Sequence, residues 1–167
     1  MNAFVVDTNV PVTANGRAEQ AGAECILACV DALERIVQTG VIVLDDANHI
    51  LGEYIRHLSM SGQPGVGDVF MKWVWQNQAV PARCERVRIT PRGKAADDFE
   101  EFPDEPALAG FDRSDRKFVA VALASRNNPH ILNAVDRDWW DYRMALEARN
   151  LRIRFLCPAV MRDKDGS

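Results

Sequence analysis

Carboxylates follow several apolar segments of this chain, in a pattern that could bind a hard cation. Asp7 directly follows the apolar run Phe4-Val5-Val6, and Asp136 follows the apolar run 131–135. Carboxylates held close together repel one another unless a cation lies among them, and Mg²⁺ or Mn²⁺ prefers such oxygen ligands. In a parallel sheet, the loops at the carboxyl ends of the strands form the ligand site. We therefore expect a metal site where these strands end.

Two predicted helices contribute further acids to the same edge of the sheet. Glu53 lies within a helix expected near residues 46–60, and more acids precede an Ala-rich apolar helix over residues 118–124. The full candidate set is Asp7, Glu53, Asp112, Asp115, Asp136 and Asp138. Helix capping by Asp7 or Asp112 is the alternative, because Asp is a common cap residue. A solvated or ion-paired Glu53 is the alternative for that helix.

Strand and helix patterns alternate along the chain that must position these acids. Hydrophobic periodicity predicts strands at 4–6, 41–44, 130–135 and 152–156, and helices at 26–37, 46–60, 69–77, 118–124 and 139–148. Strand–helix–strand units imply right-handed crossovers. The expected fold class is α/β, a three-layer α/β/α arrangement around a central, mostly parallel sheet. Residues 1–157 would form one domain, with a polar loop at 11–21 and a polar tail at 158–167.

Charge is distributed unevenly along the sequence. The 167 residues carry a net charge of −4, which argues against a nonspecific polyanion binder and leaves room for a local basic groove. Residues 83–94 hold five basic residues and one acid, the best local candidates for phosphate contacts. Residues 97–105 hold six acids and predict an exposed loop that either repels a polyanion or engages a basic partner.

The cysteine spacing matches neither a zinc site nor a dithiol motif. Cys25 and Cys29 are four residues apart on one predicted helix, while Cys84 and Cys157 stand alone. We therefore expect buried free thiols in a reducing compartment. The sequence has no basic segment followed by a long apolar run, and no apolar stretch approaches the ~20 residues of a membrane span. These features predict a cytoplasmic protein without a membrane segment.

Four sequence motifs occur in order along the chain: Phe4-Val5-Val6-Asp7-Thr8-Asn9-Val10, Leu51-Gly52-Glu53-Tyr54-Ile55, Asp115-Arg116-Lys117-Phe118-Val119-Ala120-Val121-Ala122 and Leu132-Asn133-Ala134-Val135-Asp136-Arg137-Asp138-Trp139. Together they resemble the PIN-domain nucleases, whose bacterial members include the VapC-type toxins. The resemblance runs from residue 3 to about residue 156. The chain departs from the family at Ala134, where the family often has Thr or Ser, in a segment 81–110 that is longer than in the compact toxins, and at Asp112, which has no clear counterpart.

The resemblance implies a metal-dependent endoribonuclease that cuts single-stranded RNA. Mg²⁺ or Mn²⁺ held by Asp7, Glu53, Asp115 and Asp136 would activate a water, with Asp138 as an accessory ligand. A toxin role with an antitoxin partner, and a homodimer, are expectations from the family alone. Candidate substrate contacts are Asn9, Arg86, Arg88, Arg113 and Arg137. The tryptophans 73, 139 and 140 are expected in the core or an interface rather than stacked on bases.

Three other classes compete with this interpretation. A haloacid dehalogenase-type phosphohydrolase needs a second Asp two residues after the first, where this chain has Asn9. A response-regulator receiver domain needs a Lys at a late strand end, and we find none. The serious alternative is a PIN-like binding or assembly module without catalysis, which the acidic segment 97–105 and the negative net charge would fit.

Overall fold

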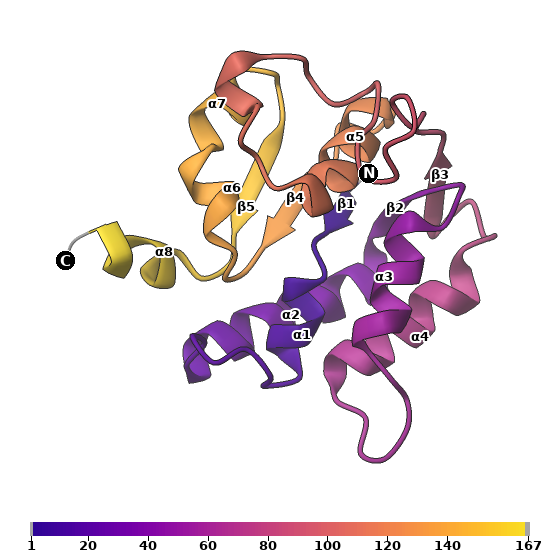
Figure 1. Ribbon diagram of the computed structural model, residues 1–167. Helices are drawn as coiled ribbons and strands as arrows, with labels where there is room; N and C mark the ends of the chain where they lie inside the picture. Colours follow the sequence, from indigo (N-terminus) through magenta and orange to yellow (C-terminus); the bar gives the residue numbers. More distant parts are fainter. Residues whose placement is uncertain (1, 166–167) are drawn as a thin grey trace.

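The protein is built around a five-stranded parallel sheet (Figure 1). The computed structural model describes residues 2–165. Its strands are β1 (Ala3–Val6), β2 (Val41–Asp45), β3 (Cys84–Val87), β4 (His130–Asn133) and β5 (Arg152–Phe155), in the spatial order β3-β2-β1-β4-β5. Every neighbouring pair is parallel. The expected α/β class with a central parallel sheet is confirmed.

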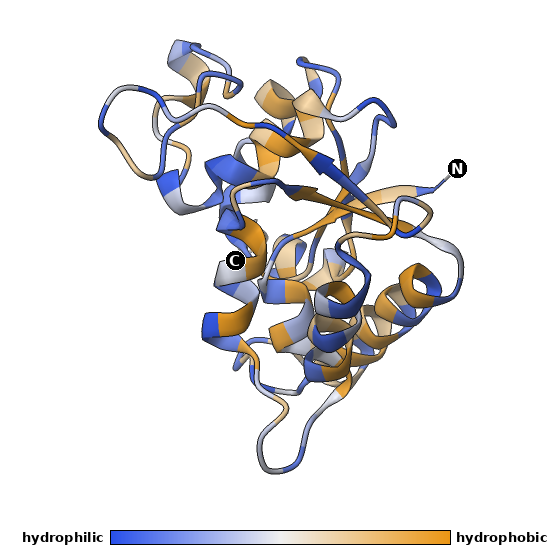
Figure 2. Cartoon of the chain, turned by 90° about the vertical axis from the view of Figure 1, so that its right-hand side faces the viewer, coloured by the Kyte–Doolittle hydropathy of each residue, from blue (hydrophilic) through white to orange (hydrophobic). Residues whose placement is uncertain are grey.

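Burial explains why the central strands read as unbroken apolar runs. All residues of β1 and β2 are buried, because helices cover both faces of a parallel sheet. The edge strand β5 instead alternates between exposed and half-buried residues. Figure 2 shows the same division, with hydrophobic strands inside and hydrophilic residues gathered on the outer parts of the helices.

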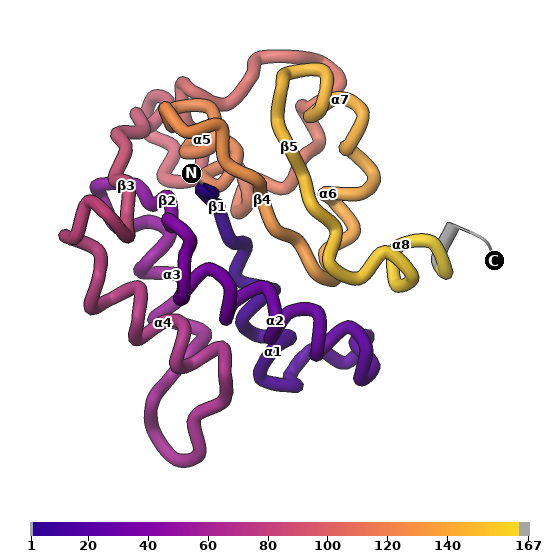
Figure 3. The backbone as a smooth tube through the Cα atoms, turned by 180° about the vertical axis from the view of Figure 1, so that it is seen from behind, coloured from indigo at the N-terminus to yellow at the C-terminus, as the bar shows by residue number. Residues whose placement is uncertain are grey.

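The helices lie in two layers, one on each face of the sheet (Figures 1 and 3). Successive right-handed crossovers run outward from β1 through β2 to β3, then return to β4 on the other side of β1, which places the later helices on the opposite face. The first layer holds α1 (Asn9–Ala14), α2 (Ala23–Thr39), α3 (His49–His57) and α4 (Val66–Asn77). The second holds α5 (Arg116–Ala124), α6 (Arg137–Asp141) and α7 (Arg143–Glu147).

Two segments expected as loop or tail are helical in part. The predicted polar loop at 11–21 begins inside α1, which buries Val10 and Ala14 because it packs against α2 and α4. Gly67 allows the close approach of α4, since a Cβ there would lie 1.9 Å from the carbonyl oxygen of Pro11. The predicted polar tail forms α8 (Pro158–Asp165), which buries Met161. Residues 166–167 of that tail lie outside the described residues.

The acidic segment 97–105 is not a freely solvated loop. Asp98 is buried and its carboxylate lies 3.0 Å from the guanidinium of Arg116, which also stacks over the ring of Phe102. Asp97 pairs with Arg113, and Glu105 lies 2.6 Å from Arg149. The neighbouring arginines lower the pKa of Asp97 and oppose the effect of burial on Asp98, whose pKa is also lowered. Three of the six acids are therefore paired with arginines of the same chain, while Glu100 and Asp104 are exposed.

The expectation of four free thiols is wrong for two of the cysteines. Cys25 in α2 and Cys157 just before α8 form a disulfide, while Cys29 and Cys84 are free and buried. The pairing spans 132 residues of sequence, so only the fold brings the two sulfurs together.

Among the described residues, no helix has both the length and the apolar character required to cross a membrane.

Candidate acidic metal centre

The candidate site lies where the strand order reverses. β1 is flanked by β2 on one side and β4 on the other, so the chain leaves the sheet in opposite directions at the carboxyl ends of β1 and β4. Open α/β sheets bind ligands in the crevice at such a switch point. Asp7 is the first residue after β1, and Asp136 lies three residues after β4. Asp115 joins them from the start of α5, which packs across β1 and β4.

Three carboxylates converge at this point. Oxygen atoms of Asp7, Asp115 and Asp136 all lie within 4.8 Å of one another. Asp7 and Asp115 are buried, and Asp136 is partly exposed. The structure thus brings together three of the four acids predicted as the principal ligands, one from each of two strand ends and one from a helix start.

Asp7 is held by donors on both carboxylate oxygens. Its Oδ1 accepts a hydrogen bond from the backbone N–H of Asn9 (2.9 Å), and its Oδ2 accepts one from the indole Nε1–H of Trp139 (2.7 Å). Burial raises the pKa of Asp7 to about 7, and the charges of Asp136 and Glu53 add to this rise against the opposing hydrogen bonds. Trp139 is fully buried, as expected, and orients the first acid of the site.

Asp115 is the least satisfied group of the centre. Its Oδ2 is buried and has no hydrogen-bond partner among the described residues. Burial, followed by the charge of Asp7 and by hydrogen bonding and repulsion from Asp136, raises the pKa of Asp115 to about 10. A buried, unpaired carboxylate oxygen facing other carboxylates is costly, and both a proton and a cation relieve that cost.

Glu53 lies beside the three carboxylates but is occupied by other partners. Its Oε1 accepts from the ammonium of Lys117 (2.9 Å), and its Oε2 accepts from the hydroxyl of Thr8, next to Asp7. Lys117 also donates to the backbone carbonyl of Ser114. Glu53 therefore does not join the group of three, and the predicted ligand role becomes that of an ion-paired neighbour. Lys117 was not singled out by sequence reasoning, although it stands two residues after Asp115.

Asp138 and Asp112 connect the loops around the centre. Asp138 accepts from the backbone N–H of Asp112 (2.9 Å), and burial raises its pKa. Asp112 caps the short 3₁₀ helix Arg113–Asp115 by accepting from the backbone and hydroxyl of Ser114. The capping alternative is thus confirmed for Asp112. Asp138 lies outside the group of three and joins the Asp136 loop to the segment that carries Asp115.

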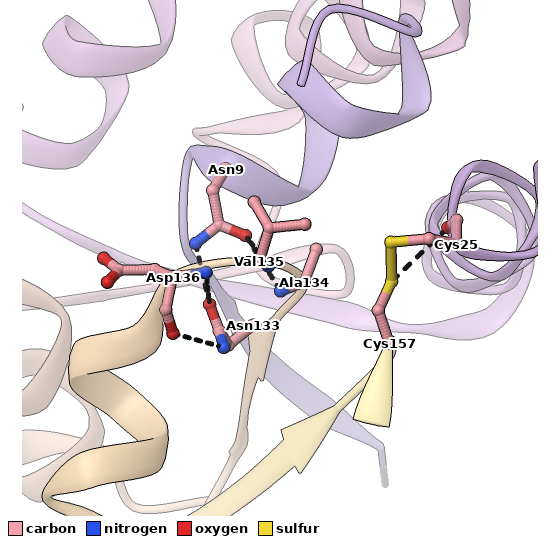
Figure 4. The surroundings of a disulfide bond; sticks show 7 residues. All are labelled: Asn9, Cys25, Asn133, Ala134, Val135, Asp136 and Cys157. Atoms are coloured by element: carbon pink, nitrogen blue, oxygen red, sulfur yellow. Dashed lines mark hydrogen bonds between the residues drawn. A yellow bond between two sulfur atoms is a disulfide. The ribbon is translucent and has the colours of Figure 1, made fainter. Parts of the chain in front are cut away.

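Asn9 joins the ends of β1 and β4 rather than pointing to solvent. Its Oδ1 accepts from the backbone N–H groups of Ala134 (2.8 Å) and Val135 (3.2 Å), and its Nδ2 donates to Oδ1 of Asn133 (2.8 Å). Asn133 in turn donates to the carbonyl of Asp136 and accepts from its N–H. Figure 4 shows this network. The predicted substrate contact Asn9 is therefore a residue that positions Asp136.

Replacing Asn9 with Ala will destabilise the protein by about 2–4 kcal/mol, because it leaves the backbone N–H groups of Ala134 and Val135 without their acceptor and removes one of the two donors to Oδ1 of Asn133. Urea unfolding will measure the loss. Asn77→Ala is the matched control, since it removes a single hydrogen bond to the carbonyl of Trp73 on α4 and will cost less than about 1 kcal/mol. Equal losses in the two variants would contradict the positioning role.

The predicted phosphate-binding arginines are dispersed. Arg86 lies on β3, two strands from β1, and donates to the carbonyl of Asp46. Arg88 is exposed just beyond that strand. Arg113 pairs with Asp97, and Arg137 donates to the carbonyl of Met161 in α8 and to Asp141. The structure therefore does not gather these arginines into one patch.

The donor set fits a hard divalent cation. Three convergent carboxylates supply the oxygen ligands that Mg²⁺ and Mn²⁺ prefer, and the buried Oδ2 of Asp115 has no hydrogen-bond partner among the described residues. Fold and site together define a doubly wound α/β domain with a buried acidic centre at its switch point.

Comparisons with known proteins add no functional assignment. No family model matches the chain, and no curated protein matches it. Among solved structures, the chain is similar to a domain of a functionally unknown protein from Methanocaldococcus jannaschii DSM 2661. That similarity has 18% sequence identity and a TM-score of 0.41, and it covers 93% of this chain and 91% of the other.

Proposed function

We propose that this protein is a PIN-type, metal-dependent endoribonuclease that hydrolyses single-stranded RNA with Mg²⁺ or Mn²⁺. The observation that carries the proposal is the convergence of Asp7, Asp115 and Asp136 at the switch point, with a buried oxygen of Asp115 left without a partner. A scaffold without a ligand gains nothing from three mutually repelling acids, two of them buried, whereas a cation offsets their repulsion.

Asp7, Asp115 and Asp136 would hold the ion. When bound, a divalent ion supplies positive charge for the phosphodiester oxygens and lowers the pKa of a water. The indole N–H of Trp139 and the backbone N–H of Asn9 each donate to one oxygen of Asp7, so that this carboxylate is already oriented. The Asn9–Asn133 network does the same for the Asp136 loop. Preorganised ligands of this kind avoid the cost of reordering them on binding.

Lys117 and Glu53 would act on the substrate side of the centre. The ammonium of Lys117 is nearly buried and lies 2.9 Å from Glu53, so it offsets one negative charge beside the three acids. A phosphate that approaches the centre meets that ammonium, which can donate a further hydrogen bond because it carries three donors. The pair therefore lowers the repulsion that an RNA strand would experience at an acidic site.

The resemblance to VapC-type toxins extends the proposal to a toxin with an antitoxin partner, a homodimer and a location in the cytoplasm, where its RNA would be found. One of the two arguments for the binding-module alternative is weakened, since three of the six acids of segment 97–105 are paired with Arg113, Arg116 and Arg149 of the same chain.

The test is cleavage of a labelled single-stranded RNA by the purified protein. We expect internal cuts with Mg²⁺ or Mn²⁺, no cutting with EDTA, and recovery when Mn²⁺ is returned in excess. Calorimetric titration with Mn²⁺ separates the alternatives. Metal binding without cleavage of a broad set of RNAs would support the binding module, and absence of metal binding by the folded protein would refute the acidic centre itself.

A further inference from the structure

A pocket of about 400 Å³ adjoins the acidic centre, between the start of α3 and the segment that precedes α5. Its size is within the range typical of small-ligand sites. Apolar atoms of Phe99 and of two alanines, residues 47 and 96, form part of its lining. The ring of His49 meets Phe99 edge to face, with centroids 5.3 Å apart. Phe99 itself is buried, so the aromatic surface that the pocket offers is the partly exposed imidazole of His49.

Three cationic side chains line the same pocket: Arg56, Arg113 and Lys117. Two of them are paired with acids that also line it, Arg113 with Asp97 and Lys117 with Glu53. Arg56, in the last turn of α3, is exposed and forms no hydrogen bond or ion pair with its side chain to any residue in the described range 2–165. An anion in the pocket would therefore find an unpaired guanidinium.

The pocket and the acidic centre share a border. Glu53 lines the pocket and accepts a hydrogen bond from Thr8, which directly follows Asp7. Lys117, two residues after Asp115, and Ser114, directly before it, line the pocket too. A ligand in the pocket would thus extend toward the three carboxylates.

We propose that this pocket binds one nucleotide of the RNA strand next to the bond that is cut. The base would lie against the imidazole of His49, and its phosphate would receive hydrogen bonds from Arg56, in keeping with the way stacking and basic groups recognise single strands. This inference rests on the proposed function for its place in the reaction, but the pocket can be tested by binding alone, without metal or cleavage.

The experiment is a titration of the protein in EDTA with uridine 5′-monophosphate and adenosine 5′-monophosphate, followed by amide chemical shifts. We expect the largest shifts at Asn48, Arg56 and Ser114, and weaker binding of inorganic phosphate and of the free nucleosides. Arg56→Gln will weaken nucleotide binding about tenfold, the effect of losing a charge-assisted hydrogen bond. Arg162→Gln, the same change at an exposed position of α8, will leave it unchanged.

Two results would overturn the inference. One is a nucleotide affinity equal to that of inorganic phosphate, which would mean that the aromatic surface binds no base. The other is equal binding by the Arg56 and Arg162 variants.

In RNA cleavage, Arg56→Gln will raise KM with little change in kcat, as expected for a contact made equally in ground and transition states. If nucleotides bind but no RNA is cut, the pocket stands and the nuclease proposal fails. If RNA is cut and Arg56→Gln changes neither KM nor nucleotide binding, the nuclease proposal stands and the pocket proposal fails.

Discussion

Asp7→Asn and Asp115→Asn will each lower metal-dependent RNA cleavage by at least about 10³-fold, because each removes a negative ligand from a three-carboxylate site. Mn²⁺ binding will weaken in parallel, which calorimetry on the same samples will show. Asp31→Asn, an acid exposed on α2, is the matched control and will retain both activities. Undiminished cutting by the Asp7 and Asp115 variants would identify the activity as a contaminant.

The same two variants will be more stable than the parent protein when no metal is present. Their folded-state pKa values, about 7 for Asp7 and about 10 for Asp115, exceed the unfolded value of 3.8. Between those limits the folded state retains protons that the unfolded state has lost, so the stability of the parent falls as pH rises. We expect a loss on the order of 3 kcal/mol between pH 5 and pH 8. Asparagine carries no charge, so each variant will show a flatter profile.

Thermal unfolding in EDTA at pH 5 and pH 8 will measure this effect, and added Mn²⁺ will reverse the order by stabilising the parent alone. Mn²⁺ affinity will rise with pH, because the carboxylates must lose their protons to bind the ion. A parent protein that is equally stable at both pH values in EDTA would show that folding does not raise the pKa values of these acids. A loss at pH 8 that is equally large in the Asp115 variant would show the same for Asp115.

Reduction of the Cys25–Cys157 disulfide will destabilise the protein by about 3–5 kcal/mol, since it frees a loop of 132 residues in the unfolded chain. For a domain of this size that corresponds to a decrease of roughly 10 °C in Tm. The change will also reach the acidic centre. Leu156, next to the disulfide, donates its N–H to the backbone carbonyl of Asn133 (2.9 Å). The side-chain amide of Asn133 in turn holds Asp136, as Figure 4 shows.

The control is a double variant, Cys25→Ser with Cys157→Ser, whose Tm will not respond to reductant. Thiol counting on the unfolded parent will find two free thiols, Cys29 and Cys84, before reduction and four after it. A parent whose Tm is unchanged by reductant would show that the disulfide does not form in solution. In a reducing cytoplasm, where disulfides are uncommon, the reduced form would be the working one.

Local sequence patterns were sufficient to predict the strands and helices whose formation depends on residues close together in the chain. Unbroken apolar runs predicted the buried strands, and helical spacing predicted α2 through α5, because burial on a sheet imposes those periods. Asp7, Asp115 and Asp136 were recognised for the same reason. Each lies directly at the end of a strand or the start of a helix, and in a parallel sheet those ends meet at one edge.

Pairings between distant residues were decided only by tertiary structure. Glu53 pairs with Lys117, 64 residues away in sequence, and Asn9 accepts a hydrogen bond from Ala134, 125 residues away. The two cysteines of the disulfide are 132 residues apart. A side chain's role depends on which polar or charged group packing places within about 3 Å of it, and no local period encodes that distance. The sequence by itself therefore determined the parallel sheet and the acids at its switch point. The fold decided which of those acids are paired and which remain open to a cation.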